Sequence, residues 1–156
     1  MANEREEENL SFRAWLKGKD GNKVDVLVQK INEEIAPKID CTQCGACCRQ
    51  LMINVTETDA DRMALHLKMN TETFKEKFVE EGNSMMIMNC IPCHFLKGNK
   101  CKAYESRFTE CREFPNLDKP GFNNRLFATL FHYGMCPIIF NVIEKLKQEM
   151  GFKRKH

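Results

Sequence analysis

Cysteine is the residue type whose number and spacing could carry chemistry in this chain. The 156 residues include nine cysteines. Four of them form one run, Cys41-x2-Cys44-Gly45-Ala46-Cys47-Cys48. A Cys-x2-Cys turn places two sulfurs on one side of a tight loop, as in thiolate zinc sites. The longer Cys-x2-Cys-x2-Cys spacing begins iron–sulfur ligand runs. The run therefore predicts a metal site, and its spacing leaves zinc and an iron–sulfur cluster both open.

The adjacent pair Cys47 and Cys48 leads to a further expectation. Neighbouring side chains in extended backbone point to opposite faces, so the two sulfurs would be poorly placed to bind one ion together. We therefore expect the pair to serve two neighbouring metal sites that share this loop.

Five more cysteines follow the run: Cys90, Cys93, Cys101, Cys111 and Cys136. Cys136 precedes Pro137, and proline suits the first position of a helix. Its sulfur would then lie at a helix N-terminus, where free N–H groups stabilise a thiolate. Cys90 can equally be a small buried apolar residue. His94 and His132, each near a cysteine in the sequence, are spare candidate ligands.

Composition and charge define the context in which these thiols act. A hydrophobic content of 42% with eleven Phe excludes a disordered chain. No apolar run approaches the roughly 18 residues of a membrane span, and an acidic N-terminus stands where a signal peptide would need a basic start. We therefore expect a soluble cytoplasmic protein with no membrane partner. Its thiols would stay reduced, which favours metal binding or catalysis over disulfides.

The basic residues give two expectations about partners. They are scattered among acidic residues except at the very C-terminus, and the net charge is only +2, so we expect no nucleic-acid partner. Several of them lie within a few residues of cysteines, where their charge would offset that of a metal bound by four thiolates. These residues are Arg49, Lys100, Lys102, Arg107 and Arg112.

The elements that must position the cysteines are predicted to be mainly helical. Apolar residues at steps of three and four predict helices over residues 24–35 and 137–150. Thr56 with Asp59 forms a capping box that opens a helix through Met69. A further helix begins with Thr71 as its cap and is stopped by Gly82. Residues 51–55 read as a strand, and residues 85–88 as a strand or a buried turn.

Residues 90–120 show little periodicity and contain four of the nine cysteines, so we expect metal to order this segment. The resulting fold class is α+β, mainly helical, with an irregular cysteine-rich metal-binding centre and short strands. We expect a single domain overall. In it, residues 1–36 form an N-terminal helical segment that packs on residues 37–156, the cysteine-cluster metal-binding domain.

The order of these motifs resembles the YkgJ-family cysteine-cluster proteins, which carry a CxxCxxCC signature and are described as zinc- or iron-chelating domains. The residues that carry the resemblance are Cys41-Thr-Gln-Cys44-Gly45-Ala46-Cys47-Cys48, Cys93-His-Phe95-Leu96, Cys101-Lys-Ala-Tyr104, Arg107, Cys111-Arg112-Glu-Phe114-Pro115 and Cys136-Pro137. It implies eight metal ligands: Cys41, Cys44, Cys47, Cys48, Cys93, Cys101, Cys111 and Cys136. Two departures are Phe108, where the family has proline, and Cys90, which has no counterpart.

The leading hypothesis is a metal-binding protein that holds an iron–sulfur cluster or one to two zinc ions through cysteine thiolates. Redox chemistry or electron transfer follows as a hypothesis if the centre is iron–sulfur. One alternative is a zinc-stabilised protein-interaction module. Another is an enzyme related to the flagellin lysine-N-methylases, which share part of the signature but are longer. No catalytic triad, P-loop or dinucleotide glycine pattern supports an enzyme, so that question stays open.

Overall fold

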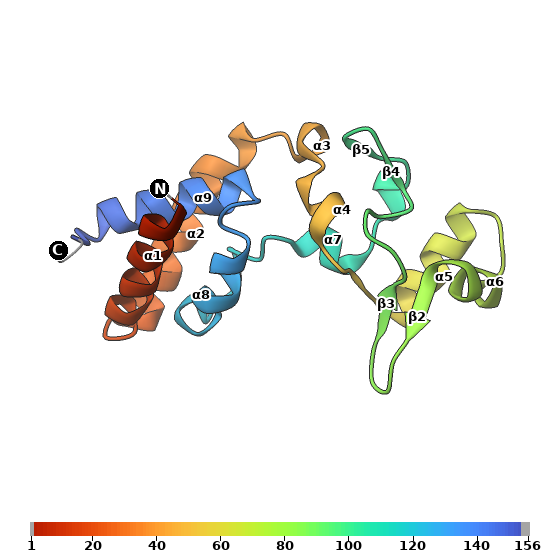
Figure 1. Ribbon diagram of the computed structural model, residues 1–156, viewed down its shortest axis with the longest axis horizontal. Coiled ribbons are helices and arrows are strands. Elements are labelled where there is room, and N and C mark those ends of the chain that lie inside the picture. The colour runs from red at the N-terminus through yellow and green to blue at the C-terminus, as the bar shows by residue number, and fades with distance from the viewer. Residues whose placement is uncertain (1, 154–156) are drawn as a thin grey trace. The chain divides into compact units, whose positions relative to one another are not determined.

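The computed structural model describes residues 2–153 and divides into two compact units (Figure 1). The helical unit contains residues up to Ile39 and those from Pro115 onward, and the cysteine unit is Asp40–Phe114. The sequence predicted a boundary after residue 36 with all later residues in one domain. In the structure the C-terminal residues instead group with the N-terminal segment. The last three residues, which are part of the basic C-terminus, lie outside the described range.

Within its described residues, the helical unit has four α-helices and one 3-10 helix. They are α1 (Ala2–Leu16), α2 (Gly21–Ile35), η1 (Ala36–Lys38), α8 (Phe122–Phe131) and α9 (Pro137–Glu149). Helix α2 packs against both α8 and α9, and α1 packs against α8 (Figure 1). Asp20 caps α2, because its carboxylate accepts from the N–H groups of Asn22 and Lys23. Pro137 is the first residue of α9, as its fixed φ predicts.

Apolar stripes on these helices explain why the unit forms. The predicted stripe on α9 is confirmed, since Ile139, Val142, Ile143 and Leu146 are all buried. Each such side chain contributes about 1.5–3 kcal/mol when it is fully buried. Helix α8 was not predicted, although Phe122 and Leu126 stand four residues apart after a glycine and are both buried. These stripes bring segments from the two ends of the chain into one core.

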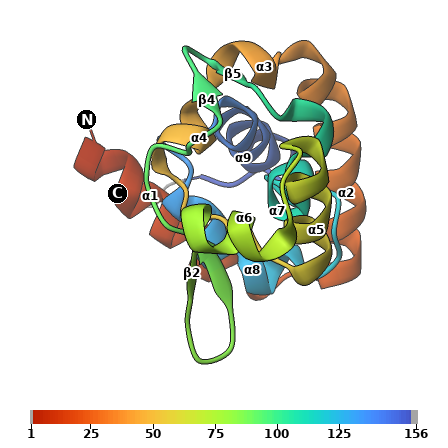
Figure 2. The same ribbon diagram turned by 90° about the vertical axis from the view of Figure 1, so that its right-hand side faces the viewer.

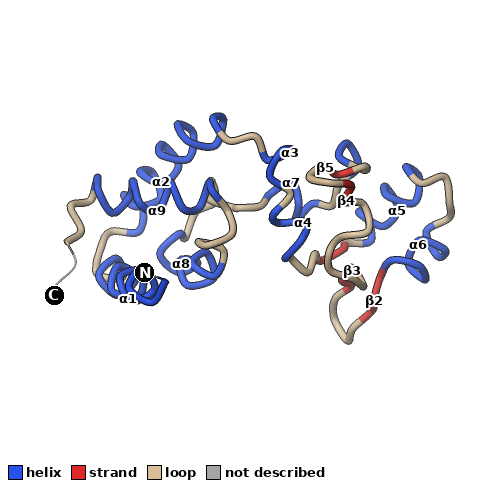
Figure 3. The backbone as a smooth tube through the Cα atoms, turned by 45° about the horizontal axis from the view of Figure 1, so that its top comes forward, coloured by secondary structure: helices blue, strands red, loops and turns tan. Residues whose placement is uncertain are grey.

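The cysteine unit contains short elements joined by long loops, as Figure 3 shows. Its helices are α3 (Cys41–Cys44), α4 (Ala46–Gln50), α5 (Glu57–His66), α6 (Thr71–Phe78), η2 (Tyr104–Ser106) and α7 (Thr109–Glu113). Its strands are β1 (Asn54–Val55), β2 (Val79–Glu81), β3 (Met86–Met88), β4 (Leu96–Lys97) and β5 (Lys100–Cys101). The predicted class, mainly helical α+β with short strands, is confirmed.

Two small antiparallel sheets order the loops of this unit. The first has the strand order β1-β3-β2, with Asn54 opposite Ile87 and Val79 opposite Met88. The second is the β4–β5 hairpin, in which Leu96 lies opposite Cys101. Helices α5 and α6 pack against each other beside the first sheet (Figure 2).

Local boundaries differ from the sequence prediction in three places. The capping box of Thr56 and Asp59 is present, but α5 ends at His66 and not at Met69. Asn70, and not Thr71, caps α6 through its side-chain oxygen. Helix α6 ends at Phe78 because the chain continues as β2, so Gly82 does not stop the helix.

Aromatic packing holds the irregular segment in place. Phe95, Ala103 and Phe108 are buried in the core of the cysteine unit together with residues of α5, α6, β1 and β3. The Phe108 ring lies 6.3 Å from that of Phe95 and 6.5 Å from that of Phe74. Residues 90–120 were expected to be ordered by metal. The structure adds that three apolar side chains of this segment are anchored in the core of the cysteine unit.

Candidate metal centre

Six cysteines line one cavity of the cysteine unit: Cys41, Cys47, Cys48, Cys93, Cys101 and Cys111. The cavity has a volume of about 220 Å³. That is far more than the roughly 10–15 Å³ needed to hold one water molecule. The rest of its wall is largely apolar, with Leu51, Ile53, Met63, Phe95, Phe108 and Phe114. Thiol ligands in an apolar pocket with room for several atoms suit a metal–thiolate centre.

Gly45 sets the geometry of the cysteine run. Its φ of +63° is left-handed and separates α3 from α4. A Cβ atom here would lie 3.0 Å from the Cα of Asn99, which is unusually tight for a contact with backbone atoms. Only glycine therefore fits both the turn and the neighbouring hairpin. The turn directs Cys41 of α3 and Cys47 of α4 to the same cavity.

Cys47 and Cys48 lie in a helix, which changes the expectation built on extended backbone. Both residues belong to α4, and both line the same cavity. A hydrogen bond from the Cys48 thiol lowers the pKa of Cys47 to about 6. The same hydrogen bond, with burial and the charge of Cys47, raises the pKa of Cys48. The Cys48 thiol therefore stabilises the Cys47 thiolate, and both residues line one cavity.

Backbone hydrogen bonds bring Cys93 and Cys101 to the run. The N–H of Cys93 donates to the carbonyl of Cys48 over 2.8 Å, which joins two segments far apart in the sequence. Cys101 is held opposite Leu96 in the β4–β5 hairpin. Burial raises the pKa values of both thiols, and the charge of Arg107 opposes this effect at Cys101.

The carboxylate of Asp59, which is completely buried, positions Cys111. One Asp59 oxygen accepts from the N–H and hydroxyl of Thr109, at 3.0 and 2.8 Å, at the start of α7. Arg62 also donates to Asp59 and reaches the carbonyl of Arg107 over 2.9 Å. Burial alone would raise the Asp59 pKa, but these hydrogen bonds lower it. Burial raises the pKa of Cys111 to about 12.

The sequence predicted Asp59 only as a helix cap. Its role as the link between α5 and the cysteine-bearing α7 was missed. The link joins residues fifty positions apart, and no local pattern reports it. The sequence shows only that Asp59 stands three residues before Arg62, a spacing at which the two side chains can pair on a helix.

Three arginines place positive charge at the cavity. Arg107 and Arg112 line it, and Arg49 packs against its rim. Their hydrogen bonds go to uncharged oxygens: Arg107 donates to the carbonyl of Tyr104, Arg112 to that of Glu105, and Arg49 to those of Cys44 and Gly98. A carbonyl oxygen carries no net charge, so these contacts orient the guanidinium groups without neutralising them. Arg107 accordingly opposes the rise in the pKa of Cys41, which burial causes.

The other candidate residues lie elsewhere. Cys44 is part of α3 but does not line the cavity. The Cys90 thiol donates to the carbonyl of Pro92 over 3.2 Å, which fits a residue outside the site. His94 bonds the side chain of Asn89 over 2.7 Å and packs edge-on against Phe78.

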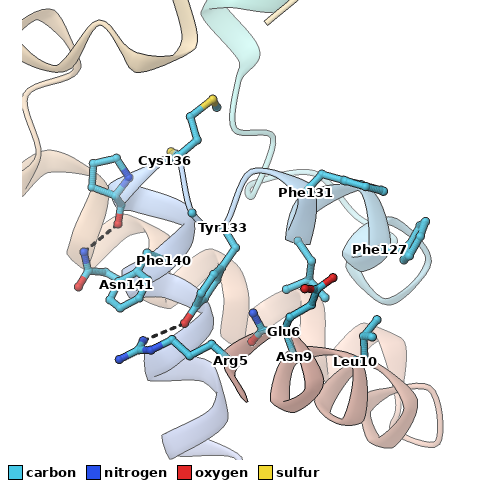
Figure 4. Close-up of a pocket in the computed structure, with 14 residues that line it drawn as sticks. Arg5, Glu6, Asn9, Leu10, Phe127, Phe131, Tyr133, Cys136, Phe140 and Asn141 are labelled. Atoms are coloured by element: carbon cyan, nitrogen blue, oxygen red, sulfur yellow. Dashed lines mark hydrogen bonds between the residues drawn. The ribbon is translucent and has the colours of Figure 1, made fainter. Parts of the chain in front are cut away.

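Cys136 and His132 belong to the helical unit. Cys136 is the N-cap residue of α9, as predicted, and it is buried. It lines a separate cavity of about 830 Å³, shown in Figure 4. Arg5 also lines this cavity and donates to the hydroxyl of Tyr133 over 3.2 Å.

All nine cysteines are free thiols. Within residues 2–153, no three Cys, His, Asp or Glu side chains stand close enough together to hold one metal ion. The six thiols surround the cavity without meeting at a point. A metal centre would therefore draw its ligands inward as it binds, which couples metal binding to the final packing of the unit.

A family model matches residues 40–132, which is more than half of the chain, and its description reads "CxxCxxCC: Putative zinc- or iron-chelating domain". The chain belongs to this CxxCxxCC family. The matched range contains all six cavity cysteines and ends before Cys136. Comparisons with curated proteins and with solved structures found no match. None of the described helices is long and apolar enough to cross a membrane.

Proposed function

We propose that this CxxCxxCC protein binds one polynuclear metal centre, an iron–sulfur cluster, in the six-cysteine cavity. The observation that carries the proposal is that six thiols from α3, α4, β5, α7 and the adjoining loop line a single cavity. The resemblance implies Cys44 and Cys136 as further ligands. We restrict the proposed centre to the six cavity residues, Cys41, Cys47, Cys48, Cys93, Cys101 and Cys111.

The size of the cavity supports a cluster over a single ion. A structural zinc site is closed, with four ligands about 2.0–2.3 Å from the ion. The cavity measures about 220 Å³, and its thiols do not converge in this way. An iron–sulfur cluster carries inorganic sulfide and several iron atoms, so it can bridge thiolates that stand further apart.

The charge around the cavity supports the same proposal. Metal centres bound by several thiolates are anionic, and Arg49, Arg107 and Arg112 keep their positive charges close to the thiols. An iron–sulfur cluster supplies one-electron transfer when it is bound, and nearby charges and hydrogen bonds set its potential. The chain's own contribution is to hold the thiols, exclude water with apolar side chains and offset the negative charge.

Zinc remains the second candidate because of one specific feature. Gly45 directly follows Cys41-x2-Cys44 and takes a left-handed conformation with φ of +63°. This is the knuckle geometry that thiolate zinc sites also use. A zinc-bound form would have a structural role and could support protein interactions.

Anaerobic purification followed by iron, zinc and sulfide analysis and an absorption spectrum tests the proposal. We expect coloured protein that contains iron and sulfide. Cys93→Ser should lose the centre, whereas Cys90→Ser, which changes a thiol outside the cavity, should retain it. Colourless protein with two zinc ions per chain would contradict the iron–sulfur cluster and support the zinc alternative. Metal binding would be contradicted altogether if the purified protein contained no metal and its residues 40–114 were fully protected from hydrogen exchange.

A further inference from the structure

The β4–β5 hairpin concentrates positive charge beside the cavity. Lys97, Lys100 and Lys102 are all exposed on it. The sequence contains no acidic residue between Glu81 and Glu105. The hairpin is therefore a basic surface within a chain whose net charge is only +2.

The same hairpin forms part of the cavity wall. Asn99, at its turn, and Cys101, on β5, both line the cavity. Strand β5 packs against α3, as Figure 1 shows. Arg49 donates to the carbonyl of Gly98 over 3.1 Å and to the side chain of Asn99, which adds a fourth cation at the turn. A molecule bound on the hairpin would thus lie next to the thiols.

Other elements of the cysteine unit carry exposed carboxylates. Exposed acidic residues lie on α5, α6 and β2: Glu57, Glu72, Glu76, Glu80 and Glu81. Nucleic-acid binding needs a basic surface long enough to contact many phosphates. The basic surface here is confined to one hairpin, and a long polyanion that extends past it would meet these carboxylates. The charge distribution favours a compact acidic group on a protein.

Asp40, the N-cap residue of α3, is an acidic side chain within electrostatic reach of the hairpin residue Lys100. Its carboxylate accepts from the N–H and hydroxyl of Thr42, at 2.9 and 2.6 Å, and Lys100 acts on it electrostatically. One carboxylate offsets only part of the charge of three lysines and Arg49. The hairpin therefore keeps a net positive charge.

We infer that the β4–β5 hairpin docks an acidic segment of a partner protein at the rim of the cysteine cavity. Charge complementarity would guide the encounter, and docking there would place the partner beside the proposed metal centre. The reason for docking at this place rests on the proposed function. The docking itself depends only on the charges of the hairpin.

Binding of a fluorescein-labelled peptide of alternating Glu and Gly, followed by anisotropy at low salt, tests the inference. The test variant carries Lys97→Gln, Lys100→Gln and Lys102→Gln. The matched control carries Lys17→Gln, Lys23→Gln and Lys30→Gln, three exposed residues of the helical unit, and has the same net charge. We expect the hairpin variant to bind about tenfold more weakly and the control to bind as wild type does, because three exposed ion pairs are lost only in the first.

Added salt should abolish the difference between the two variants, since exposed charges are screened. Equal peptide affinity of the hairpin variant and wild type would overturn the inference. So would tighter binding of an oligothymidylate of the same charge than of the peptide. Metal content and circular dichroism are measured for each protein. If the hairpin variant keeps its metal but no longer binds the peptide, docking is separate from metal binding. If wild-type protein contains no metal, only the proposed function is refuted.

Discussion

The thiols of the cavity differ in how readily they ionise. The Cys47 thiolate is the most readily formed, because the hydrogen bond from the Cys48 thiol lowers the pKa of Cys47 to about 6. Burial raises the pKa values of Cys41, Cys93 and Cys101, and that of Cys111 to about 12. In metal-free protein at neutral pH most of these sulfurs are therefore protonated. Metal must displace protons to bind them.

We predict that metal binding releases protons and strengthens as the pH rises. The raised thiol pKa values mean that protonated sulfurs compete with metal throughout the neutral range. Titration calorimetry with zinc or cobalt in two buffers of different ionisation enthalpy measures the protons released. Binding with no proton release would contradict the protonation states described here.

Asp59→Asn is predicted to destabilise the cysteine unit by about 3 kcal/mol, the usual cost of breaking a buried charge pair. The change removes a charge that holds Arg62 and Thr109. Because the folded-state pKa of Asp59 is lowered, its stabilisation is present above the unfolded pKa of about 3.9 and is lost as the pH falls through the folded value. Urea unfolding at several pH values measures both effects. Asp61→Asn, at an exposed position on the same helix, is the control and should cost less.

At the scale of elements, the site is built from pieces too short to be stable alone. Helices α3 and α4 span four and five residues, and isolated helices of this length do not persist in water. Their geometry depends on the turn at Gly45 and on the hairpin that packs against it. The metal centre and the hairpin should therefore respond together to changes at this turn.

Gly45→Ala is predicted to cost more stability than Gly98→Ala and to reduce bound metal. Both glycines are left-handed, with φ of +63° and +62°. An alanine Cβ at position 45 would also clash with Asn99 at 3.0 Å, whereas nothing lies within 4 Å at position 98. We expect about 1 kcal/mol from the conformation alone at Gly98 and about 2–3 kcal/mol or more at Gly45. Thermal unfolding and metal analysis of the two variants test this prediction. Equal losses of stability in both variants would contradict the close packing of Gly45 against Asn99.

At the scale of the whole chain, each of the two units has buried apolar side chains of its own. Phe12, Val28 and Ile143 are buried in the helical unit, and Phe74, Met88 and Phe108 in the cysteine unit. The six cavity cysteines all belong to the second unit. Its stability should depend on metal more strongly than that of the helical unit.

Removal of metal with a chelator is predicted to lower hydrogen-exchange protection within residues 40–114. Residues 4–39 and 115–153 should keep most of theirs, because their core contains no proposed ligand of the cavity. Exchange measured by mass spectrometry on the full chain tests this. The single Trp, Trp15 in α1, offers an independent fluorescence probe of the helical unit. Equal loss of protection in both units would contradict the division.

The sequence alone determined the chemistry and the strongest helices. Cysteine spacing predicted a metal site, since ligand type and turn geometry are local properties. The α2 and α9 stripes and the capping box of α5 were predictable for the same reason. Helix α8 and the pairing of residues 115–153 with the N-terminal segment were not, because they depend on contacts distant in sequence.

Tertiary structure decided which cysteines line the same cavity. Cys47 and Cys48 face one cavity because the chain is helical there, which adjacency in the sequence did not reveal. Cys111 reaches the cavity through the buried carboxylate of Asp59, fifty residues from Thr109. The kind of candidate ligand follows from residue type. Their placement around one cavity follows from packing, which depends on apolar side chains such as Phe95 and Phe108 that carry no metal chemistry.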